Sequence, residues 1–121
     1  MIKCGKPPYL ECSSRGDKRF SAFYARIKSR GNKSIEELYQ AAKIFADGTT
    51  GLSPREAKGK RAINMPEVAA FYDELWKEYF AENPEYIKYL KQYNGYSDMF
   101  GRPNCQCQAI AIYKIINNRK E

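Results

Sequence analysis

The pattern of hydrophobic and polar positions along the chain predicts a mostly helical protein. The clearest pattern covers residues 34–45, where apolar residues recur at helical spacing. Ser34 is followed three residues later by Glu37, which forms a capping box and specifies where this helix begins. One stripe of the helix should therefore face a core, and it consists of Ile35, Leu38, Tyr39, Ala42 and Phe45.

Three polar residues of the same segment fall in one row beside this stripe. Glu36, Gln40 and Lys43 are spaced at i, i+4 and i+7, so an acid, an amide and an amine point the same way. Such rows are common on solvated helices, where they form salt bridges. The spacing alone therefore favours an exposed face, and only agreement with other parts of the chain makes the row a candidate site.

Two further helices have clear start signals. Ser53, Pro54 and Glu56 open a short helix that Gly59 ends, and its end is basic, as expected near a helix C-terminus. Asn64 with Glu67 is expected to cap a longer helix. Its broad apolar stripe, which includes a tryptophan more typical of a core than of a ligand site, consists of Val68, Tyr72, Leu75, Trp76, Tyr79 and Phe80.

The remaining segments complete the predicted fold. Asn83 and Pro84 start a fourth helix that ends at Asn94-Gly95, and a last helix covers about 105–116. Residues 9–12 predict an edge strand, 20–28 predict a covered strand or extended segment, and 96–104 predict a loop. The fold class is therefore α+β and predominantly α-helical. Residues 1–121 are expected to form one compact domain, with a short N-terminal strand pair packed on about five helices.

Charge and composition limit the kinds of partner, catalytic group and metal site that the chain can have. The formal charge is +7, from 21 Lys and Arg against 14 Asp and Glu, which favours anionic partners such as nucleic acid or a phosphorylated nucleotide. The chain has no histidine, which excludes Ser-His-Asp and Cys-His catalysis and every His-ligated metal site. Its 4 cysteines lack the usual zinc-ligand spacing, so free thiols are the favoured state and no metal is expected.

The expected location is cytoplasmic, without a membrane. No apolar run approaches the roughly 20 residues that a membrane-spanning helix needs. The segment that begins Met1-Ile2-Lys3-Cys4-Gly5 has no apolar signal core.

Three separated stretches resemble one family. Phe20-Ser21-Ala22-Phe23-Tyr24-Ala25-Arg26-Ile27 resembles the Leu-Ser-Asn-Phe-Tyr opening of the NADAR family, named for its association with NAD and ADP-ribose. Residues 36–45 and 53–58 resemble its Glu-His-Tyr-Phe-Gln-Ala-x-Lys-Phe helix and Ser-Pro-x-x-Ala segment. Residues 98–101 are similar to its Asp-x-x-Trp-Gly loop. The resemblance covers residues 20–116 in order, and the chain departs from it at Ala22, Glu37, Phe100 and 103–107.

The resemblance implies an N-glycosidase that cleaves a ribosylated base, without a cofactor. Its substrate would be ADP-ribosylated guanosine, free or in nucleic acid, or a phosphoribosylated riboflavin intermediate. Glu36 and Asp98 are the expected carboxylates, because an acid beside the sugar stabilises the charge that develops there. Lys43 is the expected nucleophile, with Glu36 as its acid/base partner.

The same resemblance supplies candidate substrate-binding residues. Gln40 is a candidate to bond a ribose hydroxyl. Arginines are candidates to bind phosphate because the guanidinium fork matches phosphate oxygens, although a solvated surface charge is the favoured alternative for each of them. Aromatic residues are candidates to stack on the base, although core packing is an equal alternative for them. The set outside the catalytic residues is Arg19, Phe23, Tyr24, Gln40, Phe100, Gly101, Arg102 and Asn104, with Arg26 as a further phosphate candidate.

Two alternatives to catalysis remain open at the level of sequence. One is a module that binds ADP-ribose or a nucleotide without turning it over. The other is a small basic nucleic-acid-binding protein with an accidental likeness to the family, whose binding would depend steeply on salt.

Overall fold

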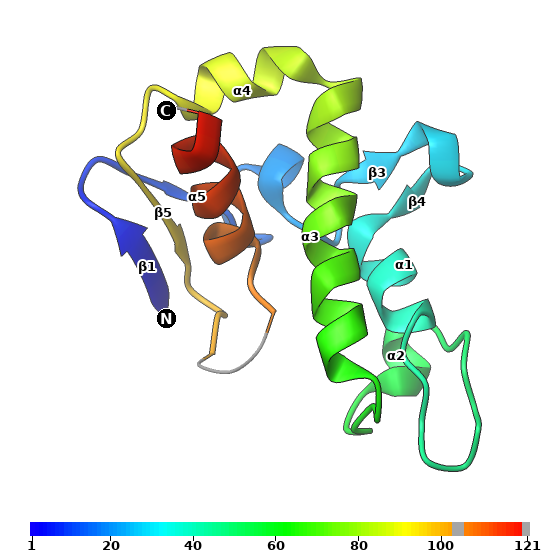
Figure 1. The fold of residues 1–121 in the computed structure, drawn as a ribbon. Coiled ribbons are helices and arrows are strands. Elements are labelled where there is room, and N and C mark those ends of the chain that lie inside the picture. The colour runs from blue at the N-terminus through cyan, green and yellow to red at the C-terminus, as the bar shows by residue number, and fades with distance from the viewer. Residues whose placement is uncertain (103–105, 120–121) are drawn as a thin grey trace.

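A computed structural model describes residues 1–102 and 106–119 of the chain. These residues form one compact, helix-rich α+β fold, as the sequence predicts. Figure 1 shows the long helix α3, Met65–Glu82, through the middle of the molecule. The three-stranded sheet and α5 lie on one side of α3, and the small hairpin, α1 and α2 lie on the other.

The sheet is built from both ends of the chain. Strand β5, Gly95–Asp98, lies between β1, Ile2–Gly5, and β2, Tyr9–Glu11, antiparallel to β1 and parallel to β2. The two N-terminal strands therefore pair with β5 and not with each other. The predicted edge strand is confirmed in β2, whereas the prediction of a loop from residue 96 is wrong for the first three residues.

Close backbone contact explains why β5 has no strand-like sequence pattern. All four of its residues are buried, so it lacks alternating polar positions. A Cβ atom at Gly95 would lie 2.6 Å from the carbonyl oxygen of Cys4, so only glycine fits there. The glycine that suggests a turn in the sequence instead allows the strands to approach.

The segment predicted as a covered strand is mainly turns. A 3-10 helix covers Lys18–Phe20, and the amides of Tyr24 and Ala25 both donate to the carbonyl of Ser21. Only Arg26–Ile27 forms a strand, β3, which pairs with β4, Lys33–Ser34. Hydrogen bonds within these turns therefore satisfy backbone groups that, in a longer strand, would pair with a neighbouring strand.

The two predicted capping boxes are confirmed. They start α1, Ile35–Ala41, at Ser34, and α2, Pro54–Ala57, at Ser53. However, α1 ends four residues earlier than predicted, so Phe45 leaves the helix stripe. Its side chain packs in a second, smaller cluster with Ala57, Ala62, Leu52 and Met65.

Helix α3 supplies the centre of the main core. Every residue of its predicted stripe is buried, and Trp76 is fully enclosed, as predicted. Asn64 is the N-cap residue of α3, as predicted, but its side chain makes no capping hydrogen bond. Its side chain instead accepts from the amide of Ile44 at 2.8 Å and donates to the carbonyl of Ala42 at 3.1 Å.

The last two helices close the core around the sheet. Helix α4, Pro84–Leu90, ends before the predicted stop at residues 94–95, and Asn83 makes no side-chain cap for it. Helix α5 covers Gln108–Arg119, so it starts and ends later than predicted. The isoleucines predicted to be buried are buried, and they are Ile112, Ile115 and Ile116.

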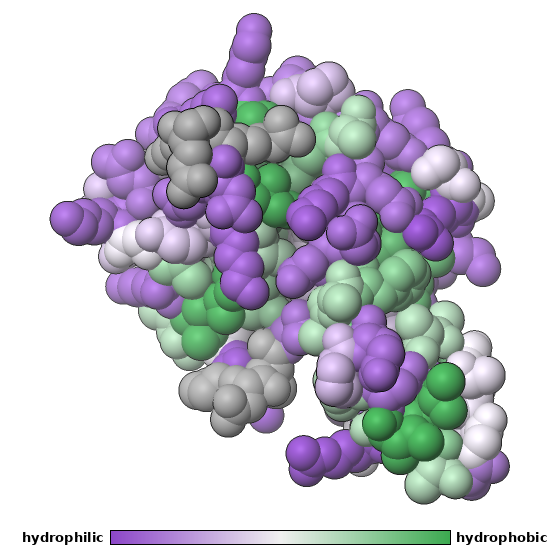
Figure 2. All heavy atoms as spheres, in the orientation of Figure 1, coloured by the Kyte–Doolittle hydropathy of each residue, from purple (hydrophilic) through white to green (hydrophobic). Residues whose placement is uncertain are grey.

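Figure 2 shows mostly hydrophilic side chains on the face of Figure 1, with a hydrophobic patch at the lower right where the loops on either side of α2 lie. The exposed Ile44 and Ile63 belong to these loops. Within residues 1–102 and 106–119, no helix combines the length and the apolar character needed to cross a membrane.

Candidate functional site

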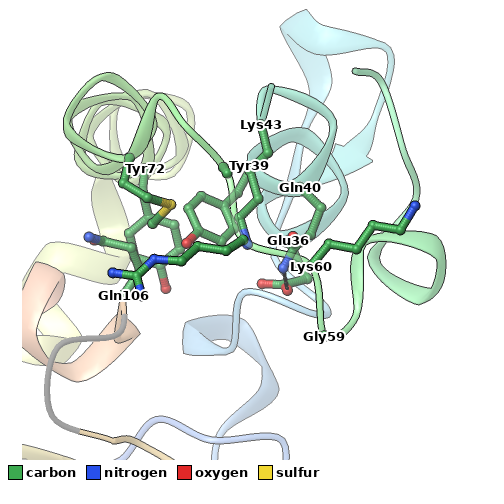
Figure 3. Close-up of a pocket in the computed structure, with 11 residues that line it drawn as sticks. Glu36, Tyr39, Gln40, Lys43, Gly59, Lys60, Tyr72 and Gln106 are labelled. Carbon is green, nitrogen blue, oxygen red and sulfur yellow. Dashed lines mark hydrogen bonds between the residues drawn. The ribbon is translucent and has the colours of Figure 1, made fainter. Parts of the chain in front are cut away.

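A cavity of about 750 Å³ lies between α1, the first turns of α3 and the loop that joins α2 to α3. Residue 106, just before α5, adds to its wall. Figure 3 shows Tyr39 and Tyr72 along one part of this cavity and Glu36 with Gln40 side by side along another. The described lining residues are Glu36, Tyr39, Gln40, Lys43, Gly59, Lys60, Arg61, Ala62, Met65, Tyr72 and Gln106.

Glu36 is the acid of this cavity. It lies in the first turn of α1, and its backbone amide donates to the carbonyl of Ala22 at 3.0 Å. Burial raises the pKa of its carboxyl above the ordinary value, while a hydrogen bond from Gln40 and the charge of Lys43 act in the opposite direction. The carboxyl therefore holds its proton to higher pH than an exposed glutamate does.

Gln40 lies one turn after Glu36 and orients it. Its side-chain nitrogen donates to Glu36 Oε1 at 2.8 Å, as the dashed line in Figure 3 shows. Its side-chain oxygen is buried and has no hydrogen-bond partner among the described residues. Because a buried acceptor without a partner is costly, this oxygen is suited to accept a hydroxyl from a bound molecule.

Lys43 lines the same cavity although it is not on α1. The helix ends at Ala41, so Lys43 lies beyond it and does not continue the predicted row on the helix face. The backbone of Lys43 is fixed instead by its amide, which donates to the carbonyl of Gln40, and by its carbonyl, which accepts from Thr50 Oγ1 at 2.9 Å. Its Nζ lies 4.9 Å from the centre of the Tyr39 ring.

Two tyrosines form the aromatic part of the wall. The rings of Tyr39 and Tyr72 are 5.0 Å apart at an interplanar angle of 68°. Burial raises the pKa of the Tyr72 hydroxyl, which is therefore neutral over the physiological range. The sequence predicts both as core residues from their helical spacing, and nothing in that spacing shows that their edges also border a cavity.

The basic residues Lys60 and Arg61 also line the cavity, although the sequence favours a role at a helix end for them and phosphate contact only as the lesser alternative. Together with Lys43 they make three cations against one acid, Glu36, among the described lining residues. The sequence places them at the end of α2, where they would stabilise the helix. Since α2 ends at Ala57, they instead belong to the loop that borders the cavity.

Asp98 does not line the cavity among the described residues, contrary to its expected place beside the substrate. It is buried, 4% exposed, at the end of β5. It accepts hydrogen bonds from Gln108 Nε2 at 2.6 Å, from the amide of Phe100 at 3.0 Å and from Cys107 Sγ at 3.4 Å. Its oxygens are thus occupied by the protein.

Gln108 connects Asp98 to the cavity wall. Its side-chain oxygen accepts from the amide of Ala22 at 3.1 Å, and the carbonyl of Ala22 in turn accepts from the amide of Glu36. Asp98 therefore lies close to the Glu36 end of α1 without facing the cavity. Hydrogen bonds thus link Asp98 to the backbone of Glu36 through Gln108 and Ala22.

The candidate aromatic residues do not line the cavity. Phe23, Tyr24 and Phe100 are at least half exposed and lie outside the lining set. The fold thus brings together Glu36, Gln40 and Lys43 but leaves the predicted stacking residues elsewhere.

The candidate phosphate-binding arginines also lie outside the lining set. Arg19 binds both oxygens of Asp17, and its guanidinium lies 4.2 Å from the centre of the Tyr89 ring. Arg102 is exposed. Arg26 contacts the carbonyl of Asn32 at 2.9 Å.

The last two candidates come from the loop after β5. Gly101 packs against β1, where a Cβ atom would lie 2.6 Å from Ile2 Cγ1. Asn104 lies outside the described residues.

The described cysteines are Cys4, Cys12 and Cys107, all of them free thiols. Burial raises the pKa of the Cys107 thiol to about 11, so this thiol is protonated and donates to Asp98. In the part of the chain that the structure describes, no three His, Cys, Asp or Glu side chains group in a way that would hold a metal ion.

Comparison with known proteins does not assign the chain to a family. No protein-family model matches the chain, and no curated protein matches it.

Proposed function

We propose that the protein is an N-glycosidase that hydrolyses the C1′–N bond of a ribosylated base, with ADP-ribosylated guanosine, free or in nucleic acid, as its main substrate. One observation carries the proposal: the protonatable carboxyl of Glu36 lies in the wall of a cation-lined cavity, hydrogen-bonded to Gln40. The resemblance of residues 20–116 to the NADAR family supports the same chemistry.

The dimensions and charge of the cavity suit such a substrate. Its volume of about 750 Å³ falls in the range of small-molecule sites, roughly 300–1,000 Å³. Lys60 and Arg61 supply charge for phosphates, because ammonium and guanidinium groups bind phosphate oxygens. The unpartnered oxygen of Gln40 supplies an acceptor for a ribose hydroxyl.

Glu36 provides the proton transfers that hydrolysis requires. In its neutral form it donates a proton to the departing base nitrogen as the C1′–N bond breaks. The resulting carboxylate stabilises the positive charge on the sugar and then takes a proton from the water that adds to C1′. The products are the free base and the ribose compound, and Glu36 ends in its starting protonation state.

Lys43 is the proposed nucleophile of this reaction, with Glu36 as its acid/base partner. Its neutral amine attacks C1′ as the C1′–N bond breaks and Glu36 protonates the departing base. The sugar ring then opens to an imine, and water hydrolyses this imine to the free sugar and returns the amine. The shared cavity and the influence of its charge on the pKa of Glu36 support this pairing. A hydride reductant added during turnover would trap the imine, and mass spectrometry would find the adduct on Lys43.

A second candidate function is binding without turnover. Glycosidases commonly use two carboxyl groups beside the scissile bond. Among the described lining residues Glu36 is the only carboxylic acid, because Asp98 is held inside the protein. This observation favours a module that retains an ADP-ribose-like ligand in the same cavity.

Product analysis separates the two functions. The protein is incubated with ADP-ribosylated guanosine, and released base and ADP-ribose are quantified by mass spectrometry. We expect turnover in the wild type, loss in Lys43→Ala, and normal turnover in Lys77→Ala, whose lysine is 59% exposed on α3. Stoichiometric binding without product would support the binding module instead.

A further inference from the structure

Four large apolar side chains are exposed on two segments that hydrogen bonds connect, the turn at residues 23–24 and the residues that follow β5. The exposed fractions are 57% for Phe23, 50% for Tyr24, 42% for Met99 and 56% for Phe100. We call these four residues the end surface. Such side chains are usually buried, so their exposure together calls for a function.

Contacts through the loop after β2 join the two segments that carry the end surface. The amide of Met99 donates to Glu11 Oε2 at 3.0 Å, and the amide of Asp17 donates to the carbonyl of Glu11 at 3.1 Å. Lys18, the next residue, places its Nζ 4.8 Å from the centre of the Tyr24 ring. The residue after β5 and the turn at residue 24 are therefore linked through a single loop.

A second set of contacts, made by buried side chains, joins the same segments. The amide of Phe100 donates to Asp98, which accepts from Gln108, and Gln108 accepts from the amide of Ala22, the residue before Phe23. Because these bridging groups are buried, they fix both segments rigidly to the core. The backbones that carry the exposed rings are thus bonded to the core.

The charge around the end surface is positive. Arg15, Lys18 and Arg102 are exposed on the segments that carry it. The acids of these segments are engaged within the protein, where Glu11 accepts three hydrogen bonds and Asp17 pairs with Arg19. Solvent therefore meets exposed rings with cations beside them, on a chain of net charge +7.

We propose that the end surface binds single-stranded nucleic acid, with bases stacked on Phe23, Tyr24 and Phe100 and phosphates bound by the neighbouring cations. Single-strand binding sites combine exposed aromatic faces, on which any base can stack, with positive charge along the backbone path. The proposal goes beyond the proposed hydrolysis and does not depend on it, because the end surface lies outside the cavity lining.

The test measures binding of unmodified, fluorescently labelled strands of about twelve nucleotides by anisotropy. We expect Phe23→Ala and Phe100→Ala each to weaken binding about fivefold or more, because each removes a stacking face. Phe100→Tyr, which keeps the ring, should bind like the wild type. The control Ile63→Ala removes a side chain that is 66% exposed in the loop before α3, and it should also bind normally.

An abasic strand of the same length gives the sharpest comparison, because it keeps the phosphates and lacks the bases. The proposal predicts clearly weaker binding of the abasic strand. It is overturned if no strand binds, if the abasic strand binds equally well, if polyglutamate competes as well as a strand, or if Phe23→Ala and Phe100→Ala match Ile63→Ala. Cleavage of ADP-ribosylated guanosine is measured separately, so failure of either proposal leaves the other intact.

Discussion

At the scale of single residues, the site depends on one acid in an unfavourable place. Glu36 is buried in a cavity wall with only partial compensation from Gln40 and Lys43, and the result is a raised pKa. An apolar or amide side chain at this position would favour the folded state more, because burial of a carboxylate costs free energy. Retention of an acid at such a position is typical of a functional site.

This cost predicts how Glu36→Gln changes stability. Because the folded-state pKa is raised, the folded chain loses stability relative to the variant as pH rises above the ordinary value of 4.5 and Glu36 ionises. We expect equal melting temperatures below pH 4.5 and a higher melting temperature for the variant at about pH 8. Glu74→Gln, at an exposed position of α3, is the control. A less stable Glu36→Gln variant at high pH would contradict the assignment.

At the scale of elements, local sequence specifies the two capping-box helix starts and the end of α2 before Gly59, but not the end of α1. The capping boxes at Ser34 and Ser53 act within four residues, so the sequence alone predicts where these helices begin. The end of α1 depends on Asn64, which lies twenty residues away in the chain and holds Ala42 and Ile44. No pattern near residue 42 contains that information.

Asn64→Ala should therefore loosen the segment after α1 and leave the start of α3 intact. Loss of its bond to the Ile44 amide is worth about 0.5–1.5 kcal/mol, so this amide should exchange its hydrogen several-fold faster. Asn118→Ala, on the exposed face of α5, should leave the Ile44 amide unchanged. Faster exchange confined to the first turn of α3 would show instead that Asn64 is an ordinary helix cap.

At the scale of the whole molecule, two halves of the chain meet through buried polar groups. Gln108, 8% exposed, joins the end of β5 to the turn before β3 through Asp98 and Ala22. The helical stripes allow the core around α3 to be predicted from sequence. The cavity combines residues 36–43, 59–65, 72 and 106, and only long-range packing brings these segments together.

Gln108→Leu tests this bridge. The change leaves the amide of Ala22 without its acceptor and removes the shortest bond to Asp98, at about 1–3 kcal/mol for each unsatisfied buried group. We expect a lower free energy of unfolding in urea. The control Gln92→Leu alters an exposed glutamine after α4 and should cost far less. Equal stability of the two variants would show that the bridge contributes nothing.

The most direct test of the account is the rate of base release by Glu36→Gln. The protein and the variant are given saturating ADP-ribosylated guanosine, and free base is measured over time. The account predicts that loss of the proton donor slows release about 10²-fold or more, whereas Glu74→Gln matches the wild type. Release at the wild-type rate by a folded Glu36→Gln variant would contradict the central claim.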